Sequence, residues 1–443
     1  MLCIIFLNLI PVEGIITDRM PKQTANEWKM RDKRMKRKVA VVGGGASGMM
    51  AAISAAGEGA EVTLFEKNDR VGKKILATGN GKCNFSNKVM SADCFYGTGS
   101  VQVEKYLQRF GTADTIHFFE QLGMRVKDRN GYLYPASEQA STVLDVLCME
   151  LARRKITVKT QSGVKSIRKE NEKLEIRTAA KESSLWDAVV LTCGGLAAPK
   201  TGSNGDGLYM ARALGHDIVT PVPALTALRC EGDFWKSITG VRCEAKIDLV
   251  VDGETVLGES GELQFTDYGI SGIPVFQISR EAAYALEARK KVCVRIHLIQ
   301  DSGADSLFWK ERWERWPQET MEEFMTGLLN QKLNRMLLQK TGIRAEEGKS
   351  AVPEGKRHKL QELCHCLEVT VNGINPFEQA QVTAGGVNFA EVTQELESRR
   401  MAGLYFAGEV LDIDGICGGY NLQWAWTSGR IAGRAAARKE QVQ

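Results

Sequence analysis

The feature that most constrains this chain is a glycine-rich turn between a short apolar strand and an apolar helix. Residues 38–42 read KVAVV, residues 43–48 read GGGASG, and the helix continues to Ala56. A second apolar strand, residues 61–65, follows and leads into an acidic residue. Strand, turn, helix and strand in this order are typical of a parallel βαβ unit that binds a dinucleotide.

The residue types in this unit suit a pyrophosphate and a ribose. Gly43 permits the positive φ of a tight turn, Gly45 lets the backbone approach a pyrophosphate, and Gly48 lets the helix pack closely on the strand. Free N–H groups at the helix N-terminus attract the pyrophosphate anion. Glu66 stands about 20 residues beyond the turn, where an acidic residue binds a ribose hydroxyl. An acid there favours FAD or NAD over NADP, whose ribose carries a phosphate.

Composition and cysteine spacing indicate a soluble cytoplasmic protein of two or three domains. The chain has 443 residues, of which 43% are hydrophobic and 25% are charged, and this balance is that of globular proteins. Its net charge of +4 is too mild to favour a nucleic-acid partner. The 11 cysteines show no C-x-x-C spacing, so we expect reduced thiols. The cluster at 364–366 (CHC) has no second ligand pair nearby, and we expect no metal site.

Residues 1–37 are predicted to be an N-terminal extension outside the fold. The apolar run at 1–12 is too short to span a bilayer. No basic residue precedes it and no small-x-small cleavage site follows it. Met30 and Met35 stand just before the first strand, where chains of this kind begin. We therefore expect the first part of the extension to be either disordered or not translated, and we expect no membrane partner.

Hydrophobic patterning divides the chain into three regions. Up to about residue 205, strands alternate with helices, which indicates a doubly wound α/β domain. Within it, the patterns predict a loop at 70–84 and one helix over 106–122. Short β-rich runs fill 218–300, and residues 305–370 read as helical. The third region is again glycine-rich and α/β in character, with markers at 381–387 and 403–409.

This order predicts a discontinuous nucleotide-binding domain that is interrupted by one inserted domain. Three tryptophans, Trp309, Trp313 and Trp316, recur at helical spacing inside the insertion. Such a stripe indicates the core of a small helical subdomain, and the alternative is an apolar lid over a flat substrate. The predicted bounds are 38–205 and 376–443 for the nucleotide-binding domain and 206–375 for the insertion.

Four further motifs resemble the bacterial flavoprotein family typified by the proteins BaiN and YhiN. They are 78–84 (TGNGKCN), 202–207 (GSNGDG), 261–267 (GELQFTD) and 418–423 (GGYNLQ). Where the family pattern is GLSGP, this chain has GISGIP, with Pro274 shifted by one position. The resemblance covers nearly everything from residue 38 onward. It implies the α/β class, as a glutathione-reductase-like Rossmann FAD domain with an inserted β-rich and helical domain.

The resemblance also implies how FAD is held. The glycine turn and the acid after the second strand take the pyrophosphate and the adenosine. A central segment lines the flavin, and a late segment holds the ribitol phosphate and presents N–H groups to the pyrimidine end of the flavin. The predicted cofactor-binding residues are Gly43, Gly45, Ala46, Ser47, Gly48, Glu66 and Lys67 on the adenosine side, Lys74, Thr78, Gly79 and Cys83 beside the flavin, Val164 at the adenine, Gly408, Glu409 and Asp412 at the ribitol phosphate, and Asn421 and Leu422 at the pyrimidine.

The resemblance further implies reduction of a C=C bond conjugated with a carbonyl. BaiN-type proteins are associated with the Δ4 and Δ6 bonds of 3-oxo bile acid thioesters, and YhiN-type proteins with a uracil of ribosomal RNA. We expect the former reaction, in secondary bile acid formation, on a hydrophobic, steroid-like enone. Because FAD takes the one complete dinucleotide fingerprint, NADH is expected as a transient electron donor. The alternatives are reduction of ribosomal RNA, flavin amine oxidation, and an FAD-binding scaffold without activity. The sequence assigns no catalytic residue.

Overall fold

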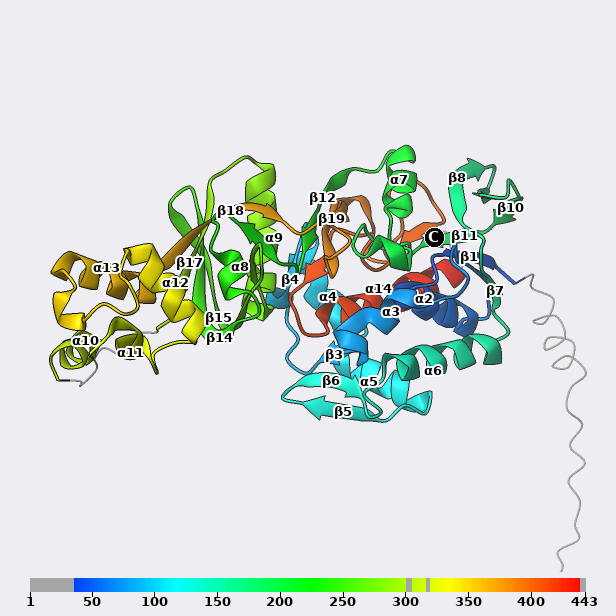
Figure 1. Cartoon of the computed structure of the whole chain (residues 1–443). Helices are drawn as coiled ribbons and strands as arrows, with labels where there is room; N and C mark the ends of the chain where they lie inside the picture. The colour runs from blue at the N-terminus through cyan, green and yellow to red at the C-terminus, as the bar shows by residue number, and fades with distance from the viewer. Residues whose placement is uncertain (1–35, 300–304, 316–318, 439–443) are drawn as a thin grey trace, which may run out of the picture. The chain divides into compact units, whose positions relative to one another are not determined.

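A five-stranded parallel sheet lies at the centre of the first apolar core, in the order β20-β11-β1-β2-β7. Figure 1 labels its strands β1, β7 and β11. The structure is a computed structural model that describes residues 36–299, 305–315 and 319–438, so the predicted extension falls outside them apart from its last two residues. All but the first residue of β1 are buried, as expected for a strand covered on both faces. The strand bounds are Lys38–Val42 (β1), Glu61–Phe65 (β2), Thr157–Lys159 (β7), Ala188–Leu191 (β11) and Leu404–Phe406 (β20).

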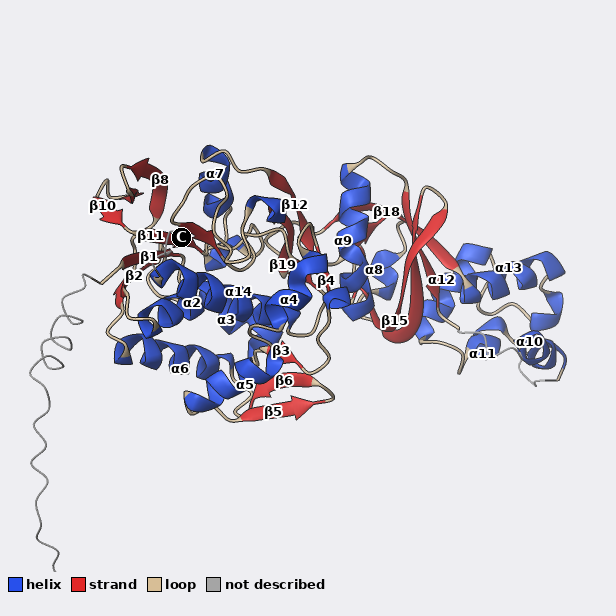
Figure 2. Cartoon of the chain, turned by 180° about the vertical axis from the view of Figure 1, so that it is seen from behind, coloured by secondary structure: helices blue, strands red, loops and turns tan. Residues whose placement is uncertain are grey.

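The two ends of the described chain meet in this core. β20 pairs in parallel with β11, and helix α14 (Tyr420–Ala437) lies beside α2 (Ala46–Gly57) in both Figure 1 and Figure 2. A Cβ on Gly433 of α14 would stand 2.2 Å from the carbonyl oxygen of Ala51 in α2. The helices can pack this closely because glycine removes that clash.

The remaining elements of this part include two that differ from the sequence prediction. The segment 70–84 is not a loop throughout, because good helix formers produce a short helix, α3, followed by a 3₁₀ turn at Thr78–Gly81. The predicted helix over 106–122 is two helices, since the Asp114 side chain accepts the Gly111 N–H at 2.9 Å and starts a new one. The elements are α3 (Lys73–Ala77), β3 (Ser86–Asn87), β4 (Phe95–Tyr96), α4 (Val103–Leu107), α5 (Thr112–Gln121), β5 (Val126–Arg129), β6 (Tyr132–Pro135), α6 (Ala140–Arg153), β8 (Val164–Glu170), β9 (Lys173–Thr178), β10 (Ser183–Trp186), α7 (Asp206–Ala213) and β21 (Asp414–Gly415).

A closed antiparallel barrel, in the order β13-β16-β15-β14-β17-β18, carries the second apolar core. Helix α9, which the sequence analysis did not predict within its β-rich region, packs on the barrel through Val275, Ile278 and Ala282 at helical spacing. Strands β12 and β19 pair with each other in a separate ribbon. The bounds are β12 (Ile218–Ala224), β13 (Leu228–Cys230), α8 (Trp235–Ile238), β14 (Arg242–Val251), β15 (Glu254–Phe265), β16 (Gly269–Ser271), α9 (Ile273–Glu287), β17 (Val292–His297), β18 (Leu367–Ile374) and β19 (Val382–Val387).

Between β17 and β18 the described residues form four helices, in the region that the sequence predicted to be helical. Trp309 and Trp313 of the first helix stack on Phe324, with ring centroids 6.3 and 4.0 Å away. Both side chains therefore belong to the second core, while Trp316 lies outside the described residues. The helices are α10 (Asp305–Glu314), α11 (Met321–Met325), α12 (Gln331–Thr341) and α13 (Glu354–His365).

The two large apolar cores are separate. One is built from buried residues within 39–211 and 387–436, and the other from residues within 228–371. This arrangement confirms the predicted fold class, an α/β Rossmann domain with a β-rich and helical insertion. The exact domain bounds stay a prediction. None of the helices in the described residues is long and apolar enough to cross a bilayer.

Candidate functional site

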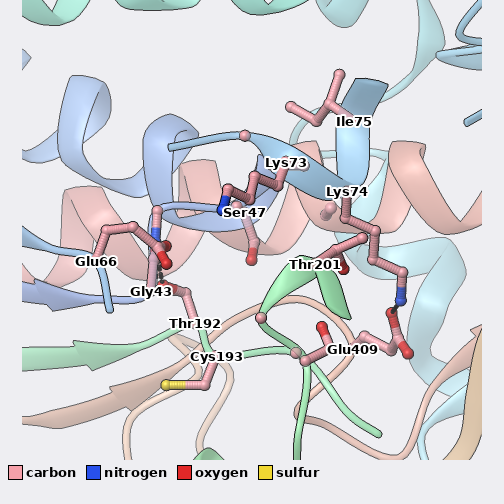
Figure 3. Close-up of a pocket in the computed structure, with 18 of the residues that line it drawn as sticks. Gly43, Ser47, Glu66, Lys73, Lys74, Ile75, Thr192, Cys193, Thr201 and Glu409 are labelled. Carbon is pink, nitrogen blue, oxygen red and sulfur yellow. Dashed lines mark hydrogen bonds and ion pairs between the residues drawn. The ribbon is translucent and has the colours of Figure 1, made fainter. Parts of the chain in front are cut away.

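A cleft opens where the parallel strands end, and distant parts of the sequence line it together (Figure 3). The glycine turn follows β1, Glu66 follows β2, Cys193 follows β11 and Glu409 follows β20, and all of them border the cleft. Protein atoms leave about 1190 Å³ unfilled here, part of it open to solvent. Ligands of open parallel sheets bind in this position, outside the carboxyl ends of the strands.

Three glycines shape the turn after β1. Gly43 has a φ of +109°, and a Cβ there would lie 2.6 Å from the carbonyl oxygen of Thr192. A Cβ on Gly45 would meet no atom within 4 Å, so this side of the turn is open to a ligand. A Cβ on Gly48 would lie 1.8 Å from the Gly43 carbonyl oxygen. The first helical hydrogen bond runs from Met49 N to Gly45 O, which leaves the N–H groups of the first turn of α2 without a helical partner.

Glu66 fixes the other side of the turn. Its Oε2 accepts the N–H of Gly44 at 2.8 Å, and its Oε1 accepts the backbone and side-chain N–H groups of Asn68, both at 2.8 Å. Oε2 therefore keeps a second lone pair for a ligand hydroxyl. The neighbouring Lys67 also borders the cleft and pairs with Asp206, Nζ to Oδ2, at 3.1 Å.

An ion pair lies further along the cleft wall. Lys74 of α3 and Glu409 after β20 meet at 2.8 Å, Nζ to Oε2, as the dashed line in Figure 3 marks. The other carboxylate oxygen of Glu409 accepts the N–H of Thr383 at 2.9 Å. Both charged side chains keep part of their surface exposed, 25% and 18%. A ligand can therefore touch the pair without breaking it, and the mutual neutralisation suits an uncharged ring better than a second anion.

Helix α14 directs its N-terminus at the cleft. A Cβ on the preceding residue, Gly419 with a φ of +94°, would lie 2.6 Å from the carbonyl oxygen of Ser86. The first helical hydrogen bond runs from Gln423 N to Gly419 O at 2.9 Å. The N–H groups before it have no partner inside the helix. Asn421 and Leu422 line the cleft at this point, where the helix dipole favours negative charge.

The side chain of Asn421 has a task that the sequence did not reveal. Its Oδ1 accepts the N–H of Gly415 and its Nδ2 donates to the carbonyl oxygen of Gly415, both at 2.8 Å. These two hydrogen bonds link β21 to the start of α14. Asp414 of β21 in turn meets Arg280 of α9, Oδ1 to Nε, at 3.2 Å. The Arg280 guanidinium also stands over two tyrosine rings, 5.0 Å from each centroid.

Asp414 is only 3% exposed at its side chain. Burial raises the pKa of its carboxyl to about 6, against the lowering effect of Arg280. A second contact from α9 lies nearby, where Gln277 Oε1 accepts the N–H of Cys417 at 2.9 Å. Helix α9 of the insertion therefore contacts the segment that leads into the N-terminus of α14 at two points. The sequence did not reveal these contacts, because nothing in a helical pattern tells which distant loop a helix will contact.

Most of the predicted cofactor-binding residues line the cleft, and the roles predicted for them stay predictions. Those at the cleft are Gly43, Gly45, Ala46, Ser47, Glu66, Lys67, Lys74, Thr78, Val164, Glu409, Asn421 and Leu422. The others, which are not among the residues that line the cleft, are Gly48, Gly79, Cys83, Gly408 and Asp412.

Three of these other residues have defined surroundings. A Cβ on Gly408 would lie 2.5 Å from Ser47 Oγ, so glycine lets this loop approach α2. Burial raises the pKa of the Cys83 thiol to about 12, so the group stays neutral. Asp412 accepts the N–H of Thr98 through Oδ2 at 2.8 Å, while its Oδ1 is buried without a hydrogen-bond partner among the described residues. Direct contact of these residues with a cofactor stays a prediction.

Several lining residues were not predicted individually. Some of them lie in segments that the sequence analysis singled out, such as Gly44 in the glycine turn, three residues of the 202–207 motif, and Gln381 in the glycine-rich marker at 381–387. Others, such as Ser162 and Trp424, reach the cleft only through folding. The additional lining residues are Val42, Gly44, Phe65, Gly72, Lys73, Ile75, Ser162, Gly163, Thr192, Cys193, Gly194, Thr201, Gly202, Ser203, Asp206, Gln381, Val382, Ile413, Trp424 and Ala425.

The Cys-His-Cys cluster lies in the second core, away from the cleft. Cys364 is buried, which raises the pKa of its thiol to about 12, and His365 Nε2 accepts the indole N–H of Trp309 at 2.8 Å. The described part of the chain contains no group of three or more His, Cys, Asp or Glu side chains that could hold a metal ion.

Comparison with known proteins extends over almost the whole chain. Residues 37–435 match the family described as HI0933-like protein Rossmann domain. The 3-dehydro-bile acid delta(4,6)-reductase of Clostridium scindens is 41% identical over 91% of this chain and 99% of its own. The ribosomal RNA dihydrouridine synthase of Haemophilus influenzae is 27% identical over 90% of this chain and 98% of its own.

Among solved structures, the 3-ketosteroid delta1-dehydrogenase of Sterolibacterium denitrificans gives a TM-score of 0.48 at 13% identity, over 90% of this chain and 99% of that one. A likeness at this level carries no argument about function.

Proposed function

The chain belongs to the HI0933-like Rossmann-domain family, as its motifs predicted, and we propose that it is an FAD-dependent reductase of conjugated enones. The proposed substrates are the Δ4 and Δ6 double bonds of 3-oxo bile acid intermediates, free or as CoA thioesters, with NADH as the electron donor. The observation that carries this proposal is the 41% identity to the bile acid reductase over 99% of that protein. For each double bond, one NADH and one proton would be consumed, and NAD⁺ and a CH–CH unit would be formed.

The cleft fits FAD by its donor set. The open side of Gly45 and the N–H groups at the start of α2 suit a pyrophosphate, and Glu66 offers a lone pair to a ribose hydroxyl. FAD, when bound, would supply the hydride carrier between NADH and the enone. The residues at the start of α14 would donate N–H groups to the pyrimidine end of the ring and so favour negative charge there.

The ion pair of Lys74 with Glu409 would border the flavin without adding net charge. For the Δ4 bond, a hydride would enter at the carbon β to the carbonyl and a proton at the α-carbon. For the Δ6 bond of the 4,6-dienone, the hydride would enter at the δ-carbon, because conjugation through Δ4 carries the carbonyl's polarisation to that carbon. NADH would visit the site transiently, since the sequence holds one complete dinucleotide fingerprint. The described cysteines are free thiols, and this suits the predicted cytoplasmic location.

A second candidate is reduction of a uridine in ribosomal RNA. The supporting observation is the 27% identity to the dihydrouridine synthase over 98% of that protein. Both reactions saturate a C=C bond next to a carbonyl, so one cleft chemistry would serve either. The lower identity makes this the weaker of the two.

The decisive experiment is an anaerobic titration followed by visible absorption. The purified protein should be yellow, should bleach with NADH, and should regain colour with a 3-oxo-4-ene bile acid or its CoA thioester. Recovery of colour only with ribosomal RNA would favour the second candidate, and recovery only with air would favour the amine oxidase alternative. A colourless protein that does not take up added FAD would refute the cofactor assignment.

A matched pair of variants tests the site assignment in the same preparation. Glu66→Gln removes the ionised acceptor at the cleft and should lower FAD retention about tenfold. Glu61→Gln, on the exposed first residue of the same strand, should leave FAD retention unchanged.

A further inference from the structure

A second cleft lies beside α14, at the end away from the first cleft, and five arginines converge on it. They are Arg109, Arg153, Arg154, Arg430 and Arg434, from the α4–α5 connection, α6 and its end, and α14. About 990 Å³ is left unfilled by protein atoms there. We propose that this cleft binds the phosphate group of a phosphorylated ligand, held by Arg430, Arg434 and Arg154. The proposal does not rest on the enone reductase function.

Arg430 is the residue of this cleft that most favours an anionic ligand. Its guanidinium is half-buried above the ring of Phe110, 5.6 Å from the centroid. Among the described residues it makes no hydrogen bond and no ion pair. Burial first, and then the charge of Arg434, lower the pKa of Arg430. A half-buried cation without an acceptor is unfavourable unless a ligand supplies one.

The neighbouring Arg434 and Arg154 have N–H donors that find no acceptor among the described residues. Arg434 donates to Glu58 through Nε at 2.6 Å, and Arg154 donates to Glu150 through Nε as well. Within the described chain, the terminal nitrogens of both guanidinium groups carry no hydrogen bond. Each arginine has five N–H donors in a planar fork. The carboxylates therefore anchor these side chains by one edge and leave the other edge for a ligand.

The spacing of the charges favours phosphate over a single carboxylate. Arg430 and Arg434 stand four residues apart on α14, where like charges face each other and repel. A phosphate offers several oxygens and nearly two negative charges, and it can bridge several guanidinium groups with bidentate bonds. Arg430 comes five residues after Ala425, the last residue of α14 in the lining of the first cleft, so the two clefts are about 8 Å apart along the helix. A ligand here would be separate from the reacting ring.

Isothermal titration calorimetry of the full chain, purified and saturated with FAD, tests the proposal with pyrophosphate at low salt. Binding is expected, and Arg430→Met should weaken it about tenfold or more. Arg430→Lys should weaken it less because the charge is kept. Arg242→Met removes an exposed arginine that pairs with Glu262 on the barrel, and it should leave binding unchanged. Melting temperatures check that the variants fold, and Arg434→Met replaces Arg430→Met if that variant does not.

A second arm uses adenosine diphosphate and a single-stranded RNA oligonucleotide to separate the two sources of phosphate. Tight binding of the diphosphate identifies a free nucleotide ligand, and preference for the oligonucleotide identifies a nucleic-acid backbone. Either result supports the proposed phosphate site if Arg430→Met abolishes binding of the favoured probe. Absence of binding by all three probes, or equal binding by wild type and Arg430→Met, overturns the proposal. These outcomes leave the enone titration unaffected, so the two proposals fail separately.

Discussion

Replacement of Arg280 by methionine should destabilise the protein in a way that grows with pH. Arg280 is the ion-pair partner of Asp414, whose side chain is 3% exposed, at 3.2 Å. Removal of one partner from a buried pair strands the other charge and costs about 3–5 kcal/mol. Protonation of Asp414 removes the buried charge and with it part of that cost. The loss of stability in Arg280→Met therefore depends on pH.

The sign follows from the direction of the pKa shift. Burial raises the pKa of Asp414 from 3.8 to about 6, and Arg280 holds it from rising further. A carboxyl whose pKa is raised on folding contributes stability below its ordinary pKa and loses that contribution as pH rises through its folded pKa. Without Arg280 the folded pKa moves above 6, and the variant keeps losing stability at pH values where the wild type no longer does.

The loss of stability in Arg280→Met can be estimated at two pH values. At pH 5 Asp414 is mostly protonated in both proteins, and the variant loses mainly the stacking of Arg280 on two tyrosine rings, about 1–2 kcal/mol. At pH 8 the full loss of about 3–5 kcal/mol is expected. Urea unfolding followed by tryptophan fluorescence at both pH values measures the difference.

Two controls accompany this measurement. Glu281→Gln removes the exposed carboxylate that also pairs with Arg280, at 2.8 Å, and should cost less than about 1 kcal/mol at either pH. The double variant Arg280→Met/Asp414→Asn removes the stranded charge and should recover most of the loss at pH 8. A loss in Arg280→Met that is equal at both pH values, or larger at pH 5, would refute the reasoning.

Three further outcomes are expected. Lys74→Met should lower FAD retention about tenfold. Lys88→Met, which removes a surface ion pair with Asp128 outside the cleft lining, should leave FAD retention within about twofold; FAD release measured by fluorescence compares the two variants, and equal effects would contradict the site. Gly48→Ala should abolish FAD binding, because its Cβ would stand 1.8 Å from a backbone oxygen of the turn; a yellow Gly48→Ala protein would contradict this. Iodoacetamide at pH 8 should label the exposed Cys366 and spare Cys83, whose thiol pKa is raised to about 12; mass spectrometry of the peptides decides, and early labelling of Cys83 would be the contrary result.

Much of the first core could be predicted because its signals are local. The apolar run of β1, the glycine turn and α2 follow one another within a few residues, and each constrains the next through backbone sterics. The elements that the sequence analysis did not predict correctly also have a physical explanation. The break before Gly111 depends on a side-chain cap, and α9 lies in a region whose short-range pattern favours strands, so only its packing on the barrel settles it as a helix.

The βαβ unit and the residue types that suit a dinucleotide follow from the sequence, because they depend on neighbours along the chain. The tertiary structure sets which distant segments contact one another. It brings Lys74 to Glu409 in the wall of the cleft and Arg280 to Asp414 near the start of α14, and it gathers Arg430 with four other arginines at the second cleft. Such contacts depend on packing between elements far apart in sequence, and no local pattern specifies which elements will meet.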